Sequence, residues 1–319
     1  MRRALVWILA LVAGCGASPP PPAPAPAGRP PVGPLSTLVP VESRLVVLAA
    51  PERLWSSGPT EHVLRAVLDD AQLDRFASRT GVDVRALREL VIATQPEGRV
   101  ALARGAFDAT MAVREAGERM APVESAADDP VVRRVGFLGR GRVDAAALDA
   151  ETILHVDGPP ALAAAVLRAS SRPAPRRPEL GARCPLGEHA SAPLVFCAPH
   201  PLELPLDTGI GVLLARERTF VASVRPEDGQ LWVRAELWGE FPPGVAENLR
   251  AFAESIAARD LGSVLGLREA LSTLVVEADE AHVRAAAAFD PARLATGLRA
   301  LLVAEIEELI EGPLSGGAP

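Results

Sequence analysis

Apolar residues along this chain recur at two different spacings. In some segments every second position is apolar, which is typical of a strand with one buried face, and in others the apolar positions follow a helical period. This switching favours an α+β fold over an all-helical one. In the first half, strands are expected over residues 43–50, 90–95, 98–106, 131–139 and 142–157. Helices are expected over residues 61–77 with Thr60 as the N-cap, over residues 107–120, and after Pro160.

The second half of the sequence repeats this arrangement. Residues 219–241 predict a hairpin with its turn at Pro226–Gly229, and residues 272–289 predict a second hairpin. Helices are expected to begin at Pro242 and to span residues 291–310. The sequence therefore alternates hairpins and helices in both halves.

A short motif occurs three times, each time where a strand is expected to end and a helix to begin. Phe107, Phe241 and Phe289 are each followed by Asp or Pro, which suit the first turn of a helix. The repeat indicates an α+β fold of two similar halves, each an antiparallel sheet with helices packed on one face, as in ferredoxin-like or related sandwiches. A chance recurrence is the alternative, because the motif is short.

The first fifteen residues have the pattern of an export signal. Arg2 and Arg3 precede an apolar run over residues 4–13, which is too short to cross a bilayer, since that takes roughly 20 residues. The run ends in Val-Ala-Gly-Cys at residues 12–15, which resembles the lipobox of bacterial lipoproteins. The resemblance covers these residues alone and implies that Cys15 is lipidated. An ordinary secretory signal that contains a cysteine is the alternative.

The lipobox resemblance also implies a location. Gly16 follows the cysteine where an Asp would retain a lipoprotein at the inner membrane, so the expected place is the outer membrane, facing the periplasm. Residues 16–34 contain nine prolines, and a polyproline segment of this length reaches on the order of 60 Å. We therefore expect a tether that holds a folded domain away from the lipid surface.

These patterns divide the chain into six segments. They are a signal peptide (1–14), an acylated cysteine with its Pro-rich tether (15–40), a first α+β half (41–169), a Pro/Arg-rich loop or linker (170–206), a second α+β half (207–312) and a flexible tail (313–319).

Charge and motifs exclude several functions. The formal net charge is −7 with no basic patterning, which is unsuited to nucleic acid. None of the motifs G-x-S-x-G, H-E-x-x-H, Walker A or G-x-G-x-x-G is present. The sequence thus predicts no enzyme and no cofactor.

Two cysteines and two histidines fall close together in the segment CPLGEHASAPLVFCAPH, residues 184–200. Because the expected compartment is oxidising, a Cys184–Cys197 disulfide is the favoured interpretation, and it would close a loop at a gain of about 3 kcal/mol. The alternatives are free thiols and a zinc site formed by Cys184, His189, Cys197 and His200, although the spacing of these four is not a usual ligand pattern.

The strand LWVRAELW, residues 231–238, predicts an interaction surface. By alternation, Leu231, Val233, Ala235 and Leu237 face the core, whereas Trp232, Arg234, Glu236 and Trp238 face the other way. In the neighbouring hairpin His282 and Arg284 likewise lie opposite the apolar positions. Two tryptophans and an arginine on a polar sheet face are typical of binding hot spots. The alternative is that a helix or the other half covers this face.

The function expected from the sequence is a non-enzymatic binding module, anchored to the membrane by lipid. It would present the tryptophan-bearing strand to a protein partner or a small apolar ligand. Two alternatives stay open, namely a metal- or thiol-dependent enzyme that uses the cluster at 184–200, and a structural component of the envelope.

Overall fold

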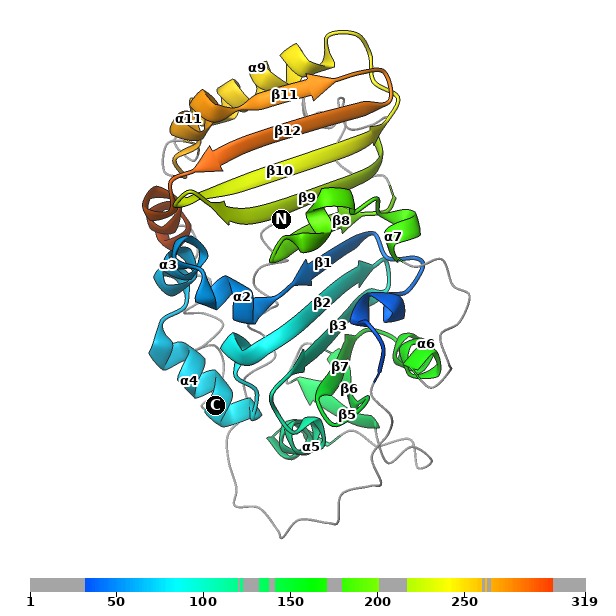
Figure 1. Cartoon of the computed structure of the whole chain (residues 1–319). Helices are drawn as coiled ribbons and strands as arrows, with labels where there is room; N and C mark the ends of the chain where they lie inside the picture. Colours follow the sequence, from blue (N-terminus) through cyan, green and yellow to red (C-terminus); the bar gives the residue numbers. More distant parts are fainter. Residues whose placement is uncertain are drawn as a thin grey trace, which may run out of the picture.

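Twelve antiparallel strands form one continuous sheet in the described part of the chain (Figure 1). The structure, a computed structural model, describes residues 32–119, 121–122, 132–137, 141–170, 180–200, 217–259, 262 and 265–300. The strands lie in the order β11-β12-β10-β9-β8-β1-β2-β3-β7-β6-β5-β4. Cys15, most of the expected tether and the expected tail lie outside the described residues.

The bounds of the elements agree with most of the predicted ranges, except that the strand expected over residues 142–157 is a hairpin of two strands, Gly141–Ala147 and Thr152–Asp157. The strands are β1 (Leu45–Ala49), β2 (Leu87–Gln95), β3 (Gly98–Gly105), β4 (Ala121–Pro122), β5 (Val132–Phe137), β6 (Gly141–Ala147), β7 (Thr152–Asp157), β8 (Leu194–Ala198), β9 (Glu217–Glu227), β10 (Gln230–Gly239), β11 (Val275–Ala278) and β12 (His282–Phe289). The α-helices are α2 (Pro51–Ser56), α3 (Gly58–Val67), α4 (Asp70–Thr80), α5 (Ala109–Arg119), α6 (Pro160–Ser170), α7 (Leu180–Arg183), α9 (Val245–Ala257) and α11 (Leu267–Ala270), and residues 291–300 are also helical. The 3-10 turns are η2 (Leu35–Leu38), η3 (Val84–Ala86), η4 (Gly187–Ser191) and η5 (Leu271–Thr273).

The single helix expected over residues 61–77 is two helices. Asp69 and Gln72 form a capping box, in which each side chain bonds the other residue's backbone N–H, and this starts α4 afresh after α3 has ended. Thr60 is not an N-cap, because α3 already begins at Gly58 with a proline in its first turn. The hydroxyl of Thr60 donates instead to the carbonyl of Leu54.

The α+β class with an antiparallel sheet is confirmed, and the two halves share one connectivity. In the first half β1 pairs with β2, β2 with β3, and the last strand β7 returns beside β3 with β6 outside it. In the second half β8, β9, β10, β12 and β11 repeat this order, and α9 follows the hairpin as α5 does in the first half. The equivalent strands β1 and β8 pair antiparallel at the centre of the sheet. The halves are thus related by an approximate twofold rotation about an axis perpendicular to the sheet. Such a rotation does not exchange the two faces of the sheet, so equivalent side chains of the two halves lie on the same face.

The segment expected to be a linker is part of the sheet. Strand β8 lies between β1 and β9, where Cys197 is opposite Val46 on one side and Val221 on the other. Residues 180–200 also contain α7 and η4. The strand LVFCA is apolar at every position, because both of its faces lie within the sheet's packed layers, and so it lacks the alternation that marks a half-exposed strand.

Helices cover both faces of the first half, whereas one covered face was expected. On the first face, α6 and η2 pack over Val91, Val100 and Leu154 in the largest core cluster. On the second face, α4 and α5 pack over Leu87 and Ala103. Alternate positions of β3 therefore enter different cores, which gives the strand two buried faces.

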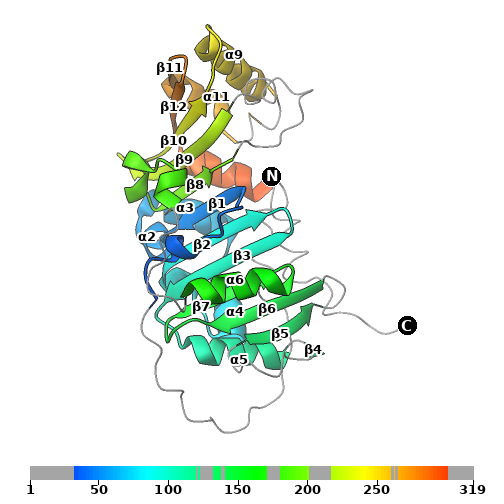
Figure 2. The same ribbon diagram turned by 90° about the vertical axis from the view of Figure 1, so that its right-hand side faces the viewer.

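In the second half, the described α-helices that follow β8 lie on the second face. There α9 packs on Leu237 and Val283, while α3 and the helix at 291–300 pack beside Leu231. Helix α9 stands behind β11 and β12 in Figure 1 and to their right in Figure 2. On the first face, η4 lies over β9, where His189 contacts Ser223, and Trp238 packs against the largest core cluster. No described α-helix lies over β10 and β12 on this face.

The folded region begins before residue 41, so residues 32–40 of the segment expected to be a tether belong to it. Leu35 and Leu38 of η2 are buried in the largest core cluster. The backbone at Val32 is held by Asp149, whose carboxylate accepts from its N–H at 2.8 Å, and by Arg104, which donates to its carbonyl at 2.8 Å. Two leucines in this Pro-rich segment bury apolar surface, which fixes it against the sheet.

Candidate functional site

The six residues predicted as an interaction surface lie together on the first face of the sheet. Trp232, Arg234, Glu236 and Trp238 point away from α9, on the side of β10 opposite to the buried Leu231 and Leu237. The register places His282 opposite Trp238 and Arg284 opposite Glu236. We call these six residues, namely Trp232, Arg234, Glu236, Trp238, His282 and Arg284, the tryptophan face.

Glu236 lies at the centre of the tryptophan face, with only 12% of its side chain exposed. One of its oxygens, Oε2, accepts a hydrogen bond from His282 Nε2 at 3.0 Å. The other, Oε1, lies 3.4 Å from His189 Nε2 and 3.8 Å from Arg284 Nε. A single poorly hydrated carboxylate thus faces three nitrogen groups, each of which compensates its charge when protonated.

His189 reaches this site from η4, which lies across β9. Its side chain is 1% exposed, and its Nδ1 lies 2.7 Å from the hydroxyl of Ser223, which is fully buried on β9. The other ring nitrogen, Nε2, is buried without a hydrogen-bond partner in the described structure. Burial lowers the pKa of His189, against the carboxylates of Glu236 and Glu188, which raise it. Burial thus favours the neutral imidazole.

The aromatic members of the tryptophan face are fixed by their neighbours. The rings of Trp238 and His282 stack with centroids 4.9 Å apart and planes 16° from parallel. The guanidinium of Arg234 lies 6.0 Å from the centre of the Trp232 ring and donates to Glu227 at 2.8 Å. Arg284, with 60% of its side chain exposed, is the most accessible charge of the group. Preset side chains of this kind lose little conformational entropy when a partner binds.

The cysteines form the expected disulfide. Cys184 and Cys197 are bonded to each other, with Cα atoms 6.2 Å apart, and both are fully buried in the largest core cluster. Because both sulfur atoms are in the disulfide, neither can bind zinc as a thiolate. The zinc site of Cys184, His189, Cys197 and His200 is therefore not formed. His200 is exposed and lies 3.4 Å from the carbonyl of Val41. The disulfide equally removes the nucleophile that a thiol enzyme would need.

A different set of residues can hold a metal ion. Glu188, His189 and Glu236 offer ligand atoms that all lie within 4.8 Å of one another. The sequence does not reveal this group, because η4 comes near β10 only once β8, β9 and β10 have paired in the sheet. The partial signal was the pair Glu188-His189, since the alternation of β10 already predicted which way Glu236 points.

No helix in the described part of the chain is both long and apolar enough to cross a membrane.

Comparisons with known proteins give no family. No protein-family model matches the chain, and no curated protein matches it. Among solved structures, crystal form III of TP0453 aligns with a TM-score of 0.49 and 9% identity, covering 85% of this chain and 99% of that chain. Crystal form IV of TP0453 aligns with a TM-score of 0.46 and 10% identity, covering 84% of this chain and 97% of that chain. The chain is similar to these structures at a level that supports no conclusion about function.

Proposed function

We propose that this chain is a lipid-anchored, non-enzymatic binding protein of the bacterial cell envelope. In this proposal, Cys15 carries the lipid, the Pro-rich segment is the tether, and the tryptophan face binds a protein partner in the periplasm. The observation that carries the proposal is the difference between the two halves on the first face of the sheet.

The two halves share their connectivity but place their last helices differently. In the first half α6 follows β7 and covers the first face, where Leu162 and Val166 are buried. In the second half the helix at 291–300 follows β12 but packs on the second face, where Ala295 lies against Leu231. The tryptophan face thus occupies the position that α6 covers in the first half, whereas η4 lies beside it as η2 lies beside the first half's strands. A face whose counterpart is covered by the chain itself is suited to being covered by another molecule.

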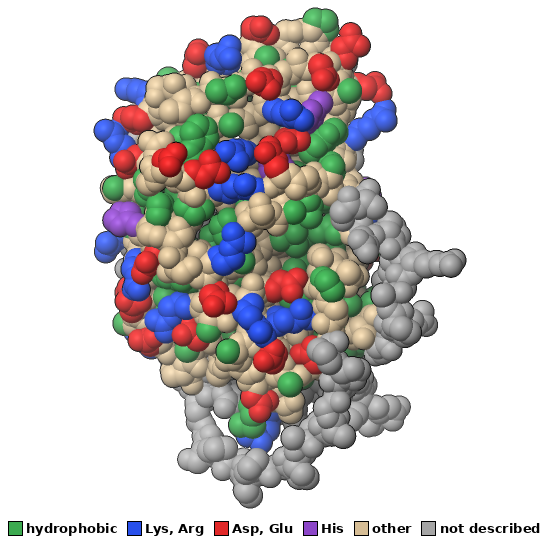
Figure 3. All heavy atoms as spheres, in the orientation of Figure 1, with side chains coloured by type: hydrophobic (Ala, Val, Ile, Leu, Met, Phe, Trp, Pro, Cys, Tyr) green, Lys and Arg blue, Asp and Glu red, His purple; other side chains and the backbone are tan. Residues whose placement is uncertain are grey.

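The composition of the tryptophan face favours a protein over a small apolar ligand. Trp and Arg are the residue types most enriched where binding energy concentrates in protein interfaces. Figure 3 shows acidic and basic side chains intermingled over these strands, as in the polar rim of a protein interface. Side chains of two adjacent strands, β10 and β12, also give a surface that a folded partner can contact at several points.

The experiment compares capture of envelope proteins by matched tryptophan variants. The full chain, exported and carrying an affinity tag, is cross-linked in intact cells and the captured proteins are quantified. Trp232→Ala and Trp238→Ala should each weaken capture of the same partner by about 30-fold or more if these are hot spots worth at least 2 kcal/mol. Trp55→Ala is the control, because Trp55 lies half-buried on α2, away from the tryptophan face.

Two outcomes are decisive. Capture that is lost in both face variants and kept in Trp55→Ala, with unchanged circular dichroism, supports the proposal. Equal capture by all three variants contradicts it, because the partner would then bind elsewhere.

A further inference from the structure

We infer that Glu188, His189 and Glu236 form a binding site for one divalent transition-metal ion, most suitably zinc. The inference goes beyond the proposed function, and metal binding needs no protein partner. It rests on the distances between the three side chains, on the buried state of His189, and on the hydrogen bonds that orient them.

The distance between the two buried ligand atoms is that of a metal site. A tetrahedral zinc ion bonds nitrogen and carboxylate oxygen at about 2.0–2.1 Å, so two of its ligands are about 3.3 Å apart. His189 Nε2 and Glu236 Oε1 are 3.4 Å apart and make no hydrogen bond with each other. Their present separation therefore leaves room for an ion that bonds both.

One of the two tautomers of His189 is suited to coordination. When Nδ1 carries the proton and donates to the hydroxyl of Ser223 at 2.7 Å, the lone pair of Nε2 points toward Glu236. A buried lone pair and a carboxylate repel each other unless a proton or a cation lies between them. A hydrogen bond from the opposite ring nitrogen is also the usual way in which proteins orient a metal-binding histidine.

Neighbouring groups hold the carboxylate of Glu236 in place. His282 Nε2 donates to Oε2 at 3.0 Å, which leaves Oε1 directed at His189.

Two nearby arginines repel a cation at this site. They are Arg284, 3.8 Å from Oε1, and Arg225, which donates to the backbone carbonyl of Glu188. Arg284 is mostly exposed, so it can turn into solvent when an ion takes its place. The two carboxylates then neutralise the ion's two charges.

The ligand types favour zinc over calcium or magnesium. Imidazole suits zinc and other late transition metals, whereas calcium and magnesium prefer oxygen ligands alone. Glu188 is exposed at the rim of the site, which gives an entry path and a fourth position for water. The ion would connect η4 to β10, and so fix the rim of the tryptophan face.

The test titrates zinc chloride into the full chain, purified in detergent after export and stripped with a chelator. Native mass spectrometry and calorimetry should find one zinc ion per chain. Glu236→Gln and His189→Gln should each lower the affinity at least about 10-fold, which is the smallest effect usual even for residues that only support a ligand. His62→Gln and His200→Gln are the controls, because both histidines are exposed and lie outside the site.

Glu188→Gln gives a variant whose fold should survive, since Glu188 is exposed. Glu188→Gln should also lower the affinity for zinc. In a separate measurement, the wild type loaded with cobalt(II) should show the visible absorption of a tetrahedral site. The inference is overturned if the wild type binds no zinc, or if zinc binds equally to the Glu188, His189 and Glu236 variants. A loss of zinc in His62→Gln or His200→Gln alone would likewise overturn it and would indicate surface binding.

Discussion

Trp238 and His282 stack ring on ring between strands β10 and β12. Their centroids are 4.9 Å apart, and they occupy directly opposed positions in the register. The same histidine donates to Glu236, so one side chain both supports an aromatic ring and orients a buried carboxylate. The stack therefore couples the aromatic and the charged parts of the tryptophan face.

This stack should contribute measurably to stability. In a double-mutant cycle, Trp238→Ala and His282→Ala should show a coupling energy of about 0.5–1.5 kcal/mol, the usual value for an aromatic pair. Urea denaturation of the wild type, both single variants and the double variant measures it. His282→Phe is the control, because it keeps a ring against Trp238 but loses the hydrogen bond to Glu236. Strictly additive losses would mean that the two rings do not stabilise each other.

The disulfide should account for a large part of the stability of the central strands. Replacing both Cys184 and Cys197 by Ala should lower the free energy of unfolding by about 3 kcal/mol, because a crosslink between positions thirteen apart restricts the unfolded chain. The comparison is urea denaturation with and without a reductant. The wild type should lose stability in reductant, whereas the double variant should not change. A wild type that is insensitive to complete reduction would contradict this.

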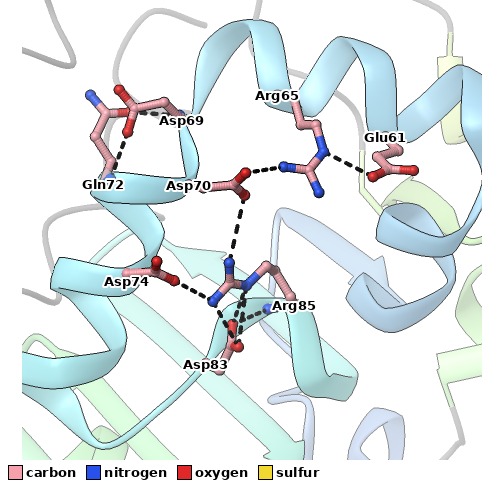
Figure 4. A network of polar contacts seen from close by, with 8 residues as sticks. All are labelled: Glu61, Arg65, Asp69, Asp70, Gln72, Asp74, Asp83 and Arg85. Atoms are coloured by element: carbon pink, nitrogen blue, oxygen red, sulfur yellow. Dashed lines mark hydrogen bonds and ion pairs between the residues drawn. The ribbon is translucent and has the colours of Figure 1, made fainter.

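A network of charges joins α3, α4 and η3, and Arg85 is its centre (Figure 4). Arg85 donates to Asp83 at 2.9 Å and to Asp74 at 2.7 Å, and it lies 3.6 Å from Asp70. Burial raises the pKa of Asp83, but the hydrogen bonds from Arg85 outweigh this and lower it. One cation thus holds three carboxylates close together.

Removing this cation should leave Asp74 and Asp83 without their arginine, whereas Asp70 keeps its pair with Arg65. Arg85→Met should lower the free energy of unfolding by about 1–2 kcal/mol, more than the 0–1 kcal/mol of an isolated surface pair. Arg218→Met is the matched control, because its pair with Glu240 is more than 70% exposed on both sides and should matter little. The loss in Arg85→Met should shrink in high salt, which screens the repulsion. An equal loss of unfolding free energy in both variants would show that the network stabilises the fold no more than an isolated surface ion pair does.

The sequence predicted the parts of this fold that depend on near neighbours. Alternation along β10 placed the tryptophans and Leu237 on opposite faces, because side-chain direction in a strand repeats every two residues. The break between α3 and α4 also has a local signal, the capping pair Asp69 and Gln72, although the apolar stripe on either side concealed it.

The features that the sequence did not predict depend on partners far along the chain. Strand β8 was expected to be part of a loop, because its pairing with β1 and β9 has no trace in its own five residues. The approach of His189 to Glu236 follows only from that pairing, which brings η4 across β9. The side on which the helix at 291–300 packs is likewise decided by contacts with α3 and Leu231 rather than by its own apolar stripe.

His155 should make the stability of this protein depend on pH. The residue lies on β7 between Ala101 of β3 and Ala145 of β6, and its Nε2 is buried without a hydrogen-bond partner in the described structure. Burial lowers the pKa of His155 to about 4, from 6.5 in an unfolded chain. As the pH falls below 6.5, the unfolded chain binds a proton that the folded protein does not accept until about pH 4. Acid therefore favours unfolding throughout this interval.

The free energy of unfolding should fall by about 2 kcal/mol between pH 7 and pH 5 through His155 alone. His155→Leu should remove that part of the decline, because leucine does not titrate and has no polar group that burial would leave unsolvated. Some decline should persist in the variant, since burial also lowers the pKa of His189. Urea denaturation at both pH values measures the difference, with His62→Leu as an exposed control that keeps the wild-type slope. If His155→Leu declines as steeply as the wild type, then His155 is already protonated or hydrated in the folded protein.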